Sequence, residues 1–187
     1  MTNASSSASH PVCPAASLVL RDGTNVTIRP IRPEDEPSMV EFHSRLSENS
    51  VHMRYFNSLS LEQRTAHERL SRICNPEPQR ELVLVADCEG TVTRQHQIIG
   101  VARLLDLPIE GEAEATVLVS DDQQSKGLGT HLVLQLLQVA RKRKLRRVNA
   151  EILRDNLSLR RMLDKLGCPV HFRLGSEPES VKAYIDL

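Results

Sequence analysis

The sequence contains no tryptophan, and aromatic residues make up only 3% of its 187 positions. So few flat rings argue against a surface on which nucleic-acid bases stack. The 24 lysine and arginine residues balance the 24 aspartate and glutamate residues, so no net charge attracts the whole chain to nucleic acid or to an anionic membrane. We therefore expect neither a nucleic-acid partner nor a membrane partner.

Long apolar runs and clustered metal ligands are also missing. The chain has no apolar run of about 18 residues and no signal-peptide core, which favours a cytoplasmic protein. The seven histidines are scattered, and so are the four cysteines, which form no C-x-x-C pair: Cys13, Cys74, Cys88 and Cys168. The sequence therefore predicts neither a zinc site nor a disulfide framework, and we expect no metal.

The length suits one domain with a substantial apolar core. Residues 1–16 are small and polar, and we expect a disordered tail there, followed by a single domain over residues 17–187. Hydrophobic periodicity and turn residues predict the elements of that domain. The predicted strands are 25–30, 81–87, 97–105, 112–120, 148–153, 170–174 and 181–185, and the predicted helices are 33–46, 50–56, 61–74, a long helix after residue 127, and 156–166.

The most informative segment joins an apolar extended run to that long amphipathic helix. It reads Gln124-Ser-Lys-Gly-Leu-Gly-Thr130. A strand–loop–helix junction brings together free main-chain N–H groups and the positive end of a helix dipole, which favours a phosphate or pyrophosphate. Gly127 and Gly129 allow a tight turn and the close approach of a bulky anion. The dinucleotide-binding pattern would need a glycine at Leu132, and no P-loop occurs, so an ordinary turn is the alternative to a different anion loop.

The predicted helix is amphipathic and ends in a basic run. Its apolar residues are spaced for one buried face: Leu128, Leu132, Val133, Leu136, Leu137 and Ala140. Residues 141–147 then carry six cations. They either complement the negative end of the helix dipole or form a docking patch for an acidic partner or a nucleotide phosphate.

Four stretches together resemble one enzyme superfamily. The pattern Q-x-x-G-x-G at 124–129 resembles the acyl-CoA pyrophosphate loop of the GNAT acetyltransferases. The segment 156–167 is similar to the N-x-x-A-x-x-L-Y-x-K-x-G-F helix of the same superfamily. Residues 20–35 and the Arg-Tyr-Phe run at 54–56 resemble one branch, the bacterial protein lysine acetyltransferases that modify acyl-CoA synthetases. The resemblance covers roughly residues 18–175.

The resemblance implies a fold and an activity. The fold would be a single-domain α/β structure with a mixed, mostly antiparallel sheet flanked by helices on both faces. The activity would be direct transfer of acetyl from acetyl-CoA to an amine, with a protein lysine ε-amino group as acceptor, for example on an acyl-CoA synthetase. The chain would act as a monomer or homodimer. The alternatives are a small-molecule amine acceptor and a non-catalytic acyl-CoA-binding regulatory module.

A lysine acceptor needs a base, because its ordinary pKa of about 10.4 keeps the amine protonated at neutral pH. Along residues 112–119 the side chains alternate, so Glu112, Glu114 and Thr116 share one strand face. The resemblance makes Glu114 the general base and leaves Glu112 peripheral; a solvated strand edge is the alternative. Glu151 matches an often acidic position and would be a second catalytic carboxylate or a structural ion-pair partner.

The resemblance also assigns the cofactor-binding residues. The main chain of Val117, Leu118 and Val119 would pair with the pantetheine arm. Asn156 would contact the cofactor or cap its own helix. Leu163 stands where many family members carry a tyrosine that protonates the leaving thiolate, so this proton would come from water or another group. The main chain of the loop would hold the pyrophosphate through Gln124, Ser125, Lys126, Gly127, Leu128, Gly129 and Thr130.

Overall fold

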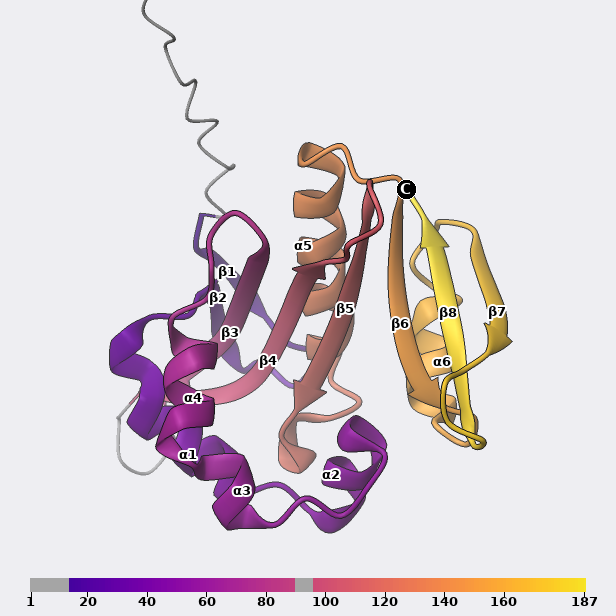
Figure 1. Cartoon of the computed structure of the whole chain (residues 1–187). Coiled ribbons are helices and arrows are strands. Elements are labelled where there is room, and N and C mark those ends of the chain that lie inside the picture. The colour runs from indigo at the N-terminus through magenta and orange to yellow at the C-terminus, as the bar shows by residue number, and fades with distance from the viewer. Residues whose placement is uncertain (1–13, 90–95) are drawn as a thin grey trace, which may run out of the picture.

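One eight-stranded sheet organises the part of the chain that the computed structural model describes, residues 14–89 and 96–187 (Figure 1). Neighbouring strands are antiparallel except β5 and β6, which are parallel. This arrangement confirms the expected mixed, mostly antiparallel sheet. In spatial order the strands are β1 (Ala16–Val19), β2 (Asn25–Pro30), β3 (Glu81–Glu89), β4 (His96–Asp106), β5 (Glu112–Val119), β6 (Arg147–Leu153), β8 (Ser180–Asp186) and β7 (Val170–Leu174).

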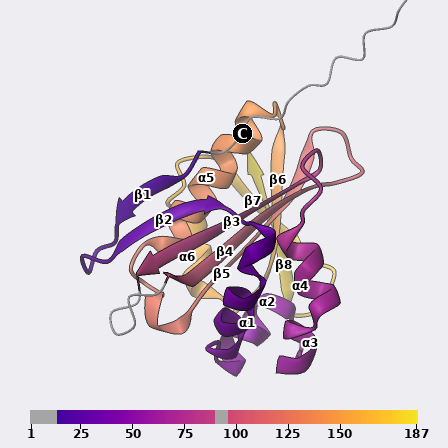
Figure 2. The same ribbon diagram turned by 90° about the vertical axis from the view of Figure 1, so that its left-hand side faces the viewer.

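Helices cover both faces of the sheet, as the second view shows (Figure 2). One face carries α1 (Glu36–Ser44), α2 (Glu48–Tyr55), α3 (Leu61–Thr65) and α4 (His67–Cys74). The other face carries α5 (Leu128–Lys142) and α6 (Leu157–Leu163). Two short 3₁₀ turns, Pro33–Asp35 and Asp121–Gln123, precede α1 and follow β5. Each face has its own apolar core, so the sheet is buried on both sides.

The helix α5 packs against the centre of the sheet. All the apolar residues that the sequence spaced along one face are buried, and Leu132, Leu136 and Leu137 are completely inaccessible. Beneath them Ala113 and Ala115 on β5 are buried too, and such small side chains allow a helix to lie close to the strands. The packing fixes the N-terminus of α5 at the end of β5.

Two local expectations differ from the structure. The predicted helix 61–74 is broken at Ala66, whose extended ψ of 129° ends α3 and begins α4, and α1 contacts both pieces. The strand β1 was not predicted, since four residues with alternating exposure are too short a signal. It begins at Ala16, and residues 1–13 of the expected tail lie outside the described residues.

Part of the basic run after α5 serves the fold. Arg143 forms an ion pair with Asp106 at 3.4 Å, and Arg147 forms one with Asp186 at 2.8 Å. Arg146 donates to the main-chain oxygen of Glu110 at 2.8 Å. These contacts tie the end of α5 and the start of β6 to neighbouring loops, and they favour a structural role for these three cations.

The strands β5 and β6 pair over a short distance only. Their parallel register runs from Glu112 opposite Arg147 to Glu114 opposite Asn149. Beyond that point they separate, and α2 contacts both strands at the open end (Figure 1). Residues 115–119 of β5 therefore have a sheet neighbour on the β4 side alone. Main-chain groups on the other side are available to a ligand.

Candidate functional site

A cleft of about 540 Å³ lies where β5 and β6 separate. Its walls come from β5, β6, α2, α6 and the loop before α5. It brings together most of the residues that the sequence assigned to cofactor binding. The assigned residues in its lining are Val117, Leu118, Val119, Gln124, Ser125, Gly127, Gly129, Thr130 and Asn156, together with Glu151.

The main chain of β5 offers hydrogen-bonding groups to this cleft at alternate residues. The N–H of Ser120 donates to Ile99 on the β4 side at 2.9 Å. Because N–H and C=O directions alternate along an antiparallel strand, Leu118 also faces β4, whereas Val117 and Val119 face the cleft. Among the three assigned residues, Val117 and Val119 therefore carry the main-chain groups that a ligand in the cleft can reach.

The N-terminus of α5 opens into the same cleft without a side-chain cap. Its first helical hydrogen bond runs from the N–H of His131 to the oxygen of Gly127 at 3.2 Å, so the N–H groups of residues 128–130 have no partner within the helix. Gly127 adopts a φ of +97° and Ser125 one of +62°, which makes a concave turn of N–H groups suited to an anion. Leu128 is buried and can act only through its main chain.

Gly129 leaves space that the fold itself does not need. A methyl group built on this residue would meet Val119 Cγ2 at 3.8 Å and Met162 Sδ at 3.9 Å, which are ordinary contacts. The packing of the protein therefore does not require glycine here. A ligand that approaches the main chain closely would require it.

Two side chains of the loop are already engaged within the protein. Gln124 Nε2 donates to Val119 O at 3.1 Å and to Ser50 Oγ at 2.9 Å. Lys126 Nζ pairs with the Asp22 carboxylate at 2.7 Å, and the hydrogen bond from Lys126 lowers the pKa of Asp22 to about 2. The side chain of Lys126 thus lies against the β1–β2 turn, and Lys126 does not line the cleft.

The two acidic residues of β5 differ in their surroundings. Glu112 accepts a hydrogen bond from Asn149 Nδ2 at 3.0 Å and lies 3.7 Å from Arg147, so it holds the β5–β6 pair together. Glu114 is half-buried at the point where the strands part, and it has no hydrogen bond or ion pair with any described residue. Its charge acts on Arg54, whose pKa is lowered by burial first and raised in part by Glu114. Glu114 is the unengaged carboxylate of this strand.

The carboxylate of Glu151 is committed to the loop between β7 and β8. Its Oε1 accepts from Ser176 Oγ and Ser180 Oγ, both at 2.6 Å, and from the main-chain N–H of Ser176. Burial alone would raise the pKa of Glu151, but these hydrogen bonds outweigh it and lower the pKa. A carboxylate held in this way is a weaker base than an ordinary glutamate, and the contacts fit the structural alternative.

Two residues of the downstream motif have clear local roles. Asn156 Oδ1 accepts from the N–H of Leu159 at 3.0 Å and so caps α6, and Asn156 also lines the cleft. Leu163 contributes to the cleft wall but is only 2% exposed and belongs to the apolar core. No hydroxyl group stands at this position.

The structure adds residues that the sequence did not single out. Arg21, Arg161 and Lys165 bring positive charge to the cleft lining. Arg21 reaches it from the β1–β2 turn, where its main-chain N–H lies 3.4 Å from Lys126 O. Arg161 and Lys165 belong to the quoted motif segment and could have been suspected. Arg21 lies in the quoted segment 20–35, but its approach to the cleft depends on the β1–β2 turn, and β1 was not predicted.

No group of three metal-binding side chains of His, Cys, Asp or Glu gathers within residues 14–89 and 96–187. Within the same ranges, no helix combines the length and apolar character that crossing a bilayer requires.

Comparison with known proteins identifies the family. The model of the acetyltransferase (GNAT) domain matches residues 25–169. An acetyltransferase of Pseudomonas aeruginosa is 28% identical over 148 residues, which are 79% of this chain and 77% of that protein. The GNAT domain of S. lividans PAT superimposes with a TM-score of 0.78 at 26% identity, covering 92% of this chain and 97% of that one. The PaiA N-acetyltransferase of Thermoplasma acidophilum, in complex with coenzyme A, has a TM-score of 0.66 at 17% identity, covering 87% of this chain and 99% of the other. The chain belongs to the GNAT acetyltransferase family and is an acyltransferase.

Proposed function

We propose that this acyltransferase moves acetyl from acetyl-CoA directly to an amine, and that the acceptor is a protein lysine. One observation carries the proposal. The unpaired edge of β5 and the uncapped N-terminus of α5 meet in a single cleft, which therefore offers both a strand-like partner for an amide-containing arm and a cradle for a pyrophosphate.

The cofactor would be held mainly by main-chain groups. Val117 and Val119 would pair with the pantetheine arm, and the N–H groups of residues 125–130 would bind the pyrophosphate. Arg21 and Arg161 would add charge around the phosphates. Because these donors are fixed before the cofactor arrives, little reorganisation is needed when negative charge develops.

Glu114 would act as the general base. It is unengaged among the described residues, and it lies two residues before Thr116, which lines the cleft. It would take a proton from the acceptor ammonium, directly or through water, so that the free amine attacks the thioester carbonyl. A cleft-facing N–H group of β5 would bind the resulting oxyanion, a contact worth roughly 3–4 kcal/mol in such sites.

The attacking nitrogen would then lose its second proton to water, and the tetrahedral intermediate would collapse, with the C–S bond breaking and the neutral amide remaining on the acceptor. Leu163 has no proton to give, so water entering the open cleft would protonate the departing thiolate of coenzyme A. The proton for the thiolate would thus come from solvent and not from a side chain of α6.

The acceptor class is supported by two likenesses. Residues 20–35 and 54–56 resemble the bacterial protein lysine acetyltransferases. The GNAT domain of S. lividans PAT is also similar to this chain, over 92% of the length of this chain. Both likenesses favour a protein acceptor over a small-molecule amine.

Incubation of the purified protein with radiolabelled acetyl-CoA and a lysate of its host tests the proposal. Label on lysines of protein bands supports it. Label confined to the small-molecule fraction would instead identify a small-molecule amine as the acceptor. Binding of acetyl-CoA without any transfer would indicate a non-catalytic regulatory module.

A further inference from the structure

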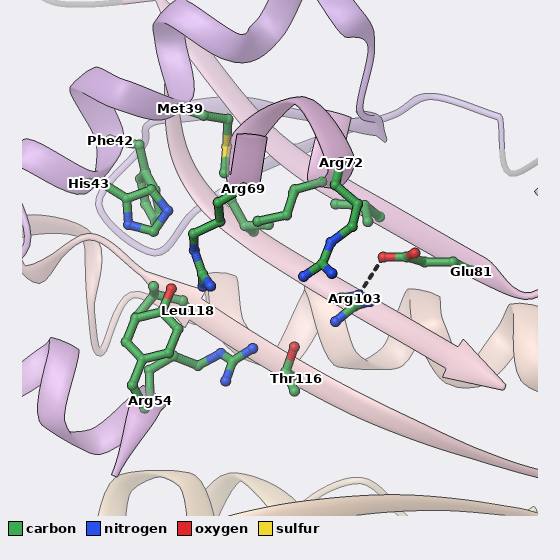
Figure 3. Close-up of a pocket in the computed structure, with 14 residues that line it drawn as sticks. Met39, Phe42, His43, Arg54, Arg69, Arg72, Glu81, Arg103, Thr116 and Leu118 are labelled. Atoms are coloured by element: carbon green, nitrogen blue, oxygen red, sulfur yellow. Dashed lines mark hydrogen bonds and ion pairs between the residues drawn. The ribbon is translucent and has the colours of Figure 1, made fainter. Parts of the chain in front are cut away.

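A second pocket, of about 80 Å³, lies between the α1–α4 helices and the sheet. This volume exceeds the roughly 30 Å³ of one water molecule, so the pocket has room for a small polar group. Four arginines converge on it from three elements (Figure 3). They are Arg54 of α2, Arg69 and Arg72 of α4, and Arg103 of β4.

These cations exceed the carboxylates around them. Glu81 is the acidic residue of the pocket lining, and it is paired with Arg103. The side chains of Arg69 and Arg72 form no hydrogen bond or ion pair with any residue in the described ranges. The guanidinium groups of Arg54 and Arg69 lie over the Tyr55 ring, at 5.0 Å and 5.2 Å from its centroid. Bringing like charges together in a partly buried space is unfavourable unless an anion joins them.

Two buried nitrogen atoms in this pocket lack a partner among the described residues. They are Arg69 Nε and His43 Nδ1. The side chain of His43 is only 2% exposed, so bulk water does not compensate for the missing hydrogen bond. Buried polar groups in folded proteins are nearly always satisfied. Both atoms can donate, His43 in the tautomer with its proton on Nδ1, and so they call for an acceptor.

The pocket adjoins the proposed site of acetyl transfer. Arg54, Thr116 and Leu118 line both this pocket and the cleft. A group in the pocket therefore lies beside the part of β5 that carries Glu114 and would face the thioester. Its position on the α1–α4 side of the sheet is opposite to α5.

We infer that this arginine pocket binds a carboxylate of the acceptor, so that the preferred acceptor carries a carboxylate near the amine that is acetylated. The inference rests on the proposed function. A guanidinium group matches a carboxylate with two parallel hydrogen bonds. The small volume suits a planar carboxylate better than a bulkier tetrahedral phosphate.

The carboxylate has two possible sources, which matched acceptor pairs separate. The first pair is a lysine peptide with glutamate or glutamine close to the lysine. The second pair is Nα-acetyl-lysine and its C-terminal amide. We expect kcat/KM to be about 10-fold or more higher for the carboxylate member of at least one pair. A preference in the peptide pair assigns an acidic side chain of a protein, and one in the second pair assigns a free carboxylate. Equal rates within both pairs would overturn the inference.

Arginine variants test whether this pocket causes the preference. Arg72→Gln changes an exposed residue, and Arg69→Gln a half-buried one, so the first is the safer variant for folding. Each variant should reduce the preference for the carboxylate member of the acceptor pair. Thermal melting checks that the variant is folded. The control Arg80→Gln removes an exposed arginine that pairs with Glu77 outside the pocket, and it should keep the full preference. A preference that survives both pocket variants contradicts the assignment.

A binding measurement keeps this inference separate from the transfer reaction. The Nε–H signal of Arg69 can be followed by NMR during titration of the wild-type protein with glutarate and with glutaramide. A shift with glutarate alone supports the pocket even if no acceptor is acetylated, in which case only the proposed function fails. The absence of a shift with glutarate, or an equal shift with glutaramide, overturns the pocket assignment.

Discussion

The side-chain amide of Gln124 donates a hydrogen bond to the main-chain oxygen of Val119 at 3.1 Å. The first residue of the 124–130 loop therefore holds the last residue of β5. The same amide donates to Ser50 of α2 at 2.9 Å. These two hydrogen bonds fix the strand edge, the loop and the helix α2 relative to one another, which gives the cleft a preformed geometry.

Substitutions at Gly129 separate cofactor binding from folding. Gly129→Ala should leave the free energy of unfolding unchanged or raise it by about 0.5–1 kcal/mol, because alanine is the better helix former and a methyl group fits here. It should nevertheless weaken coenzyme A binding. Gly129→Glu should abolish binding, because it places a negative charge where the pyrophosphate is expected.

The control for that charge is Gln138→Glu, at an exposed position of the same helix outside the cleft lining. Calorimetric titration and thermal melting of the three variants check the prediction. Unchanged affinity in Gly129→Glu would refute the role of the loop.

Removal of the proposed base should affect the rate rather than cofactor affinity. Glu114→Gln should lower kcat by about 100-fold or more while the dissociation constant of acetyl-CoA stays the same. Glu110→Gln, an exposed residue outside the cleft, is the matched control and should retain full activity. Turnover of Glu114→Gln close to that of the control would mean that the base lies elsewhere.

Glu151 should matter for stability more than for chemistry. Glu151→Gln should reduce the free energy of unfolding by roughly 1–3 kcal/mol, since the charged acceptor of three hydrogen bonds is lost. In a double-mutant cycle with Ser180→Ala the effects should be strongly non-additive. Because the pKa of Glu151 is lowered in the folded state, its stabilisation is complete above its ordinary pKa of 4.5 and is lost as pH falls through the lower folded value.

A loss of kcat in Glu151→Gln at unchanged thermal stability would instead assign this carboxylate to catalysis. The comparison with Glu114→Gln is therefore informative. Glu151→Gln should have the lower melting temperature, and Glu114→Gln should have the lower kcat.

His43 should make the protein less stable in mild acid. Burial and the nearby charges of Arg64, Arg69 and Arg54 lower its pKa from 6.5 to about 4. Between these two pH values the unfolded chain binds the proton more readily, so stability is lost as pH falls from 6.5 towards 4. The loss attributable to His43 amounts to at most roughly 3 kcal/mol.

Denaturant unfolding at several pH values measures this loss. His43→Phe should flatten the dependence, whereas His52→Phe, at an exposed position of α2, should leave it intact. An equally steep dependence in His43→Phe would assign the effect to other groups.

The sequence predicted those features that depend on local pattern. The apolar spacing of α5 identified its buried face because one helix meets one sheet. The glycines of the loop identified the uncapped helix end. The alternation along β5 predicted that Glu114 and Thr116 share one strand face, and the structure shows that Thr116 lines both cavities.

Features created by tertiary contact were not accessible from the sequence. No local sequence pattern indicates that Gln124 forms a hydrogen bond with Ser50. Nor does one indicate that Glu151 accepts hydrogen bonds from Ser176 and Ser180. The convergence of Arg54 with Arg69 likewise depends on how α2 and α4 pack on the sheet. The break at Ala66 and the strand β1 each involve only a few residues. Tertiary packing determines them, and their local sequence patterns are too weak to predict them.

The central claim is that the cleft between β5 and β6 binds coenzyme A through the 124–130 loop. Calorimetric titration of the purified protein with coenzyme A tests it most directly. We predict saturable heat release with one site per chain, accompanied by a rise in melting temperature that is absent in Gly129→Glu. Neither heat nor thermal protection at millimolar coenzyme A would contradict the claim.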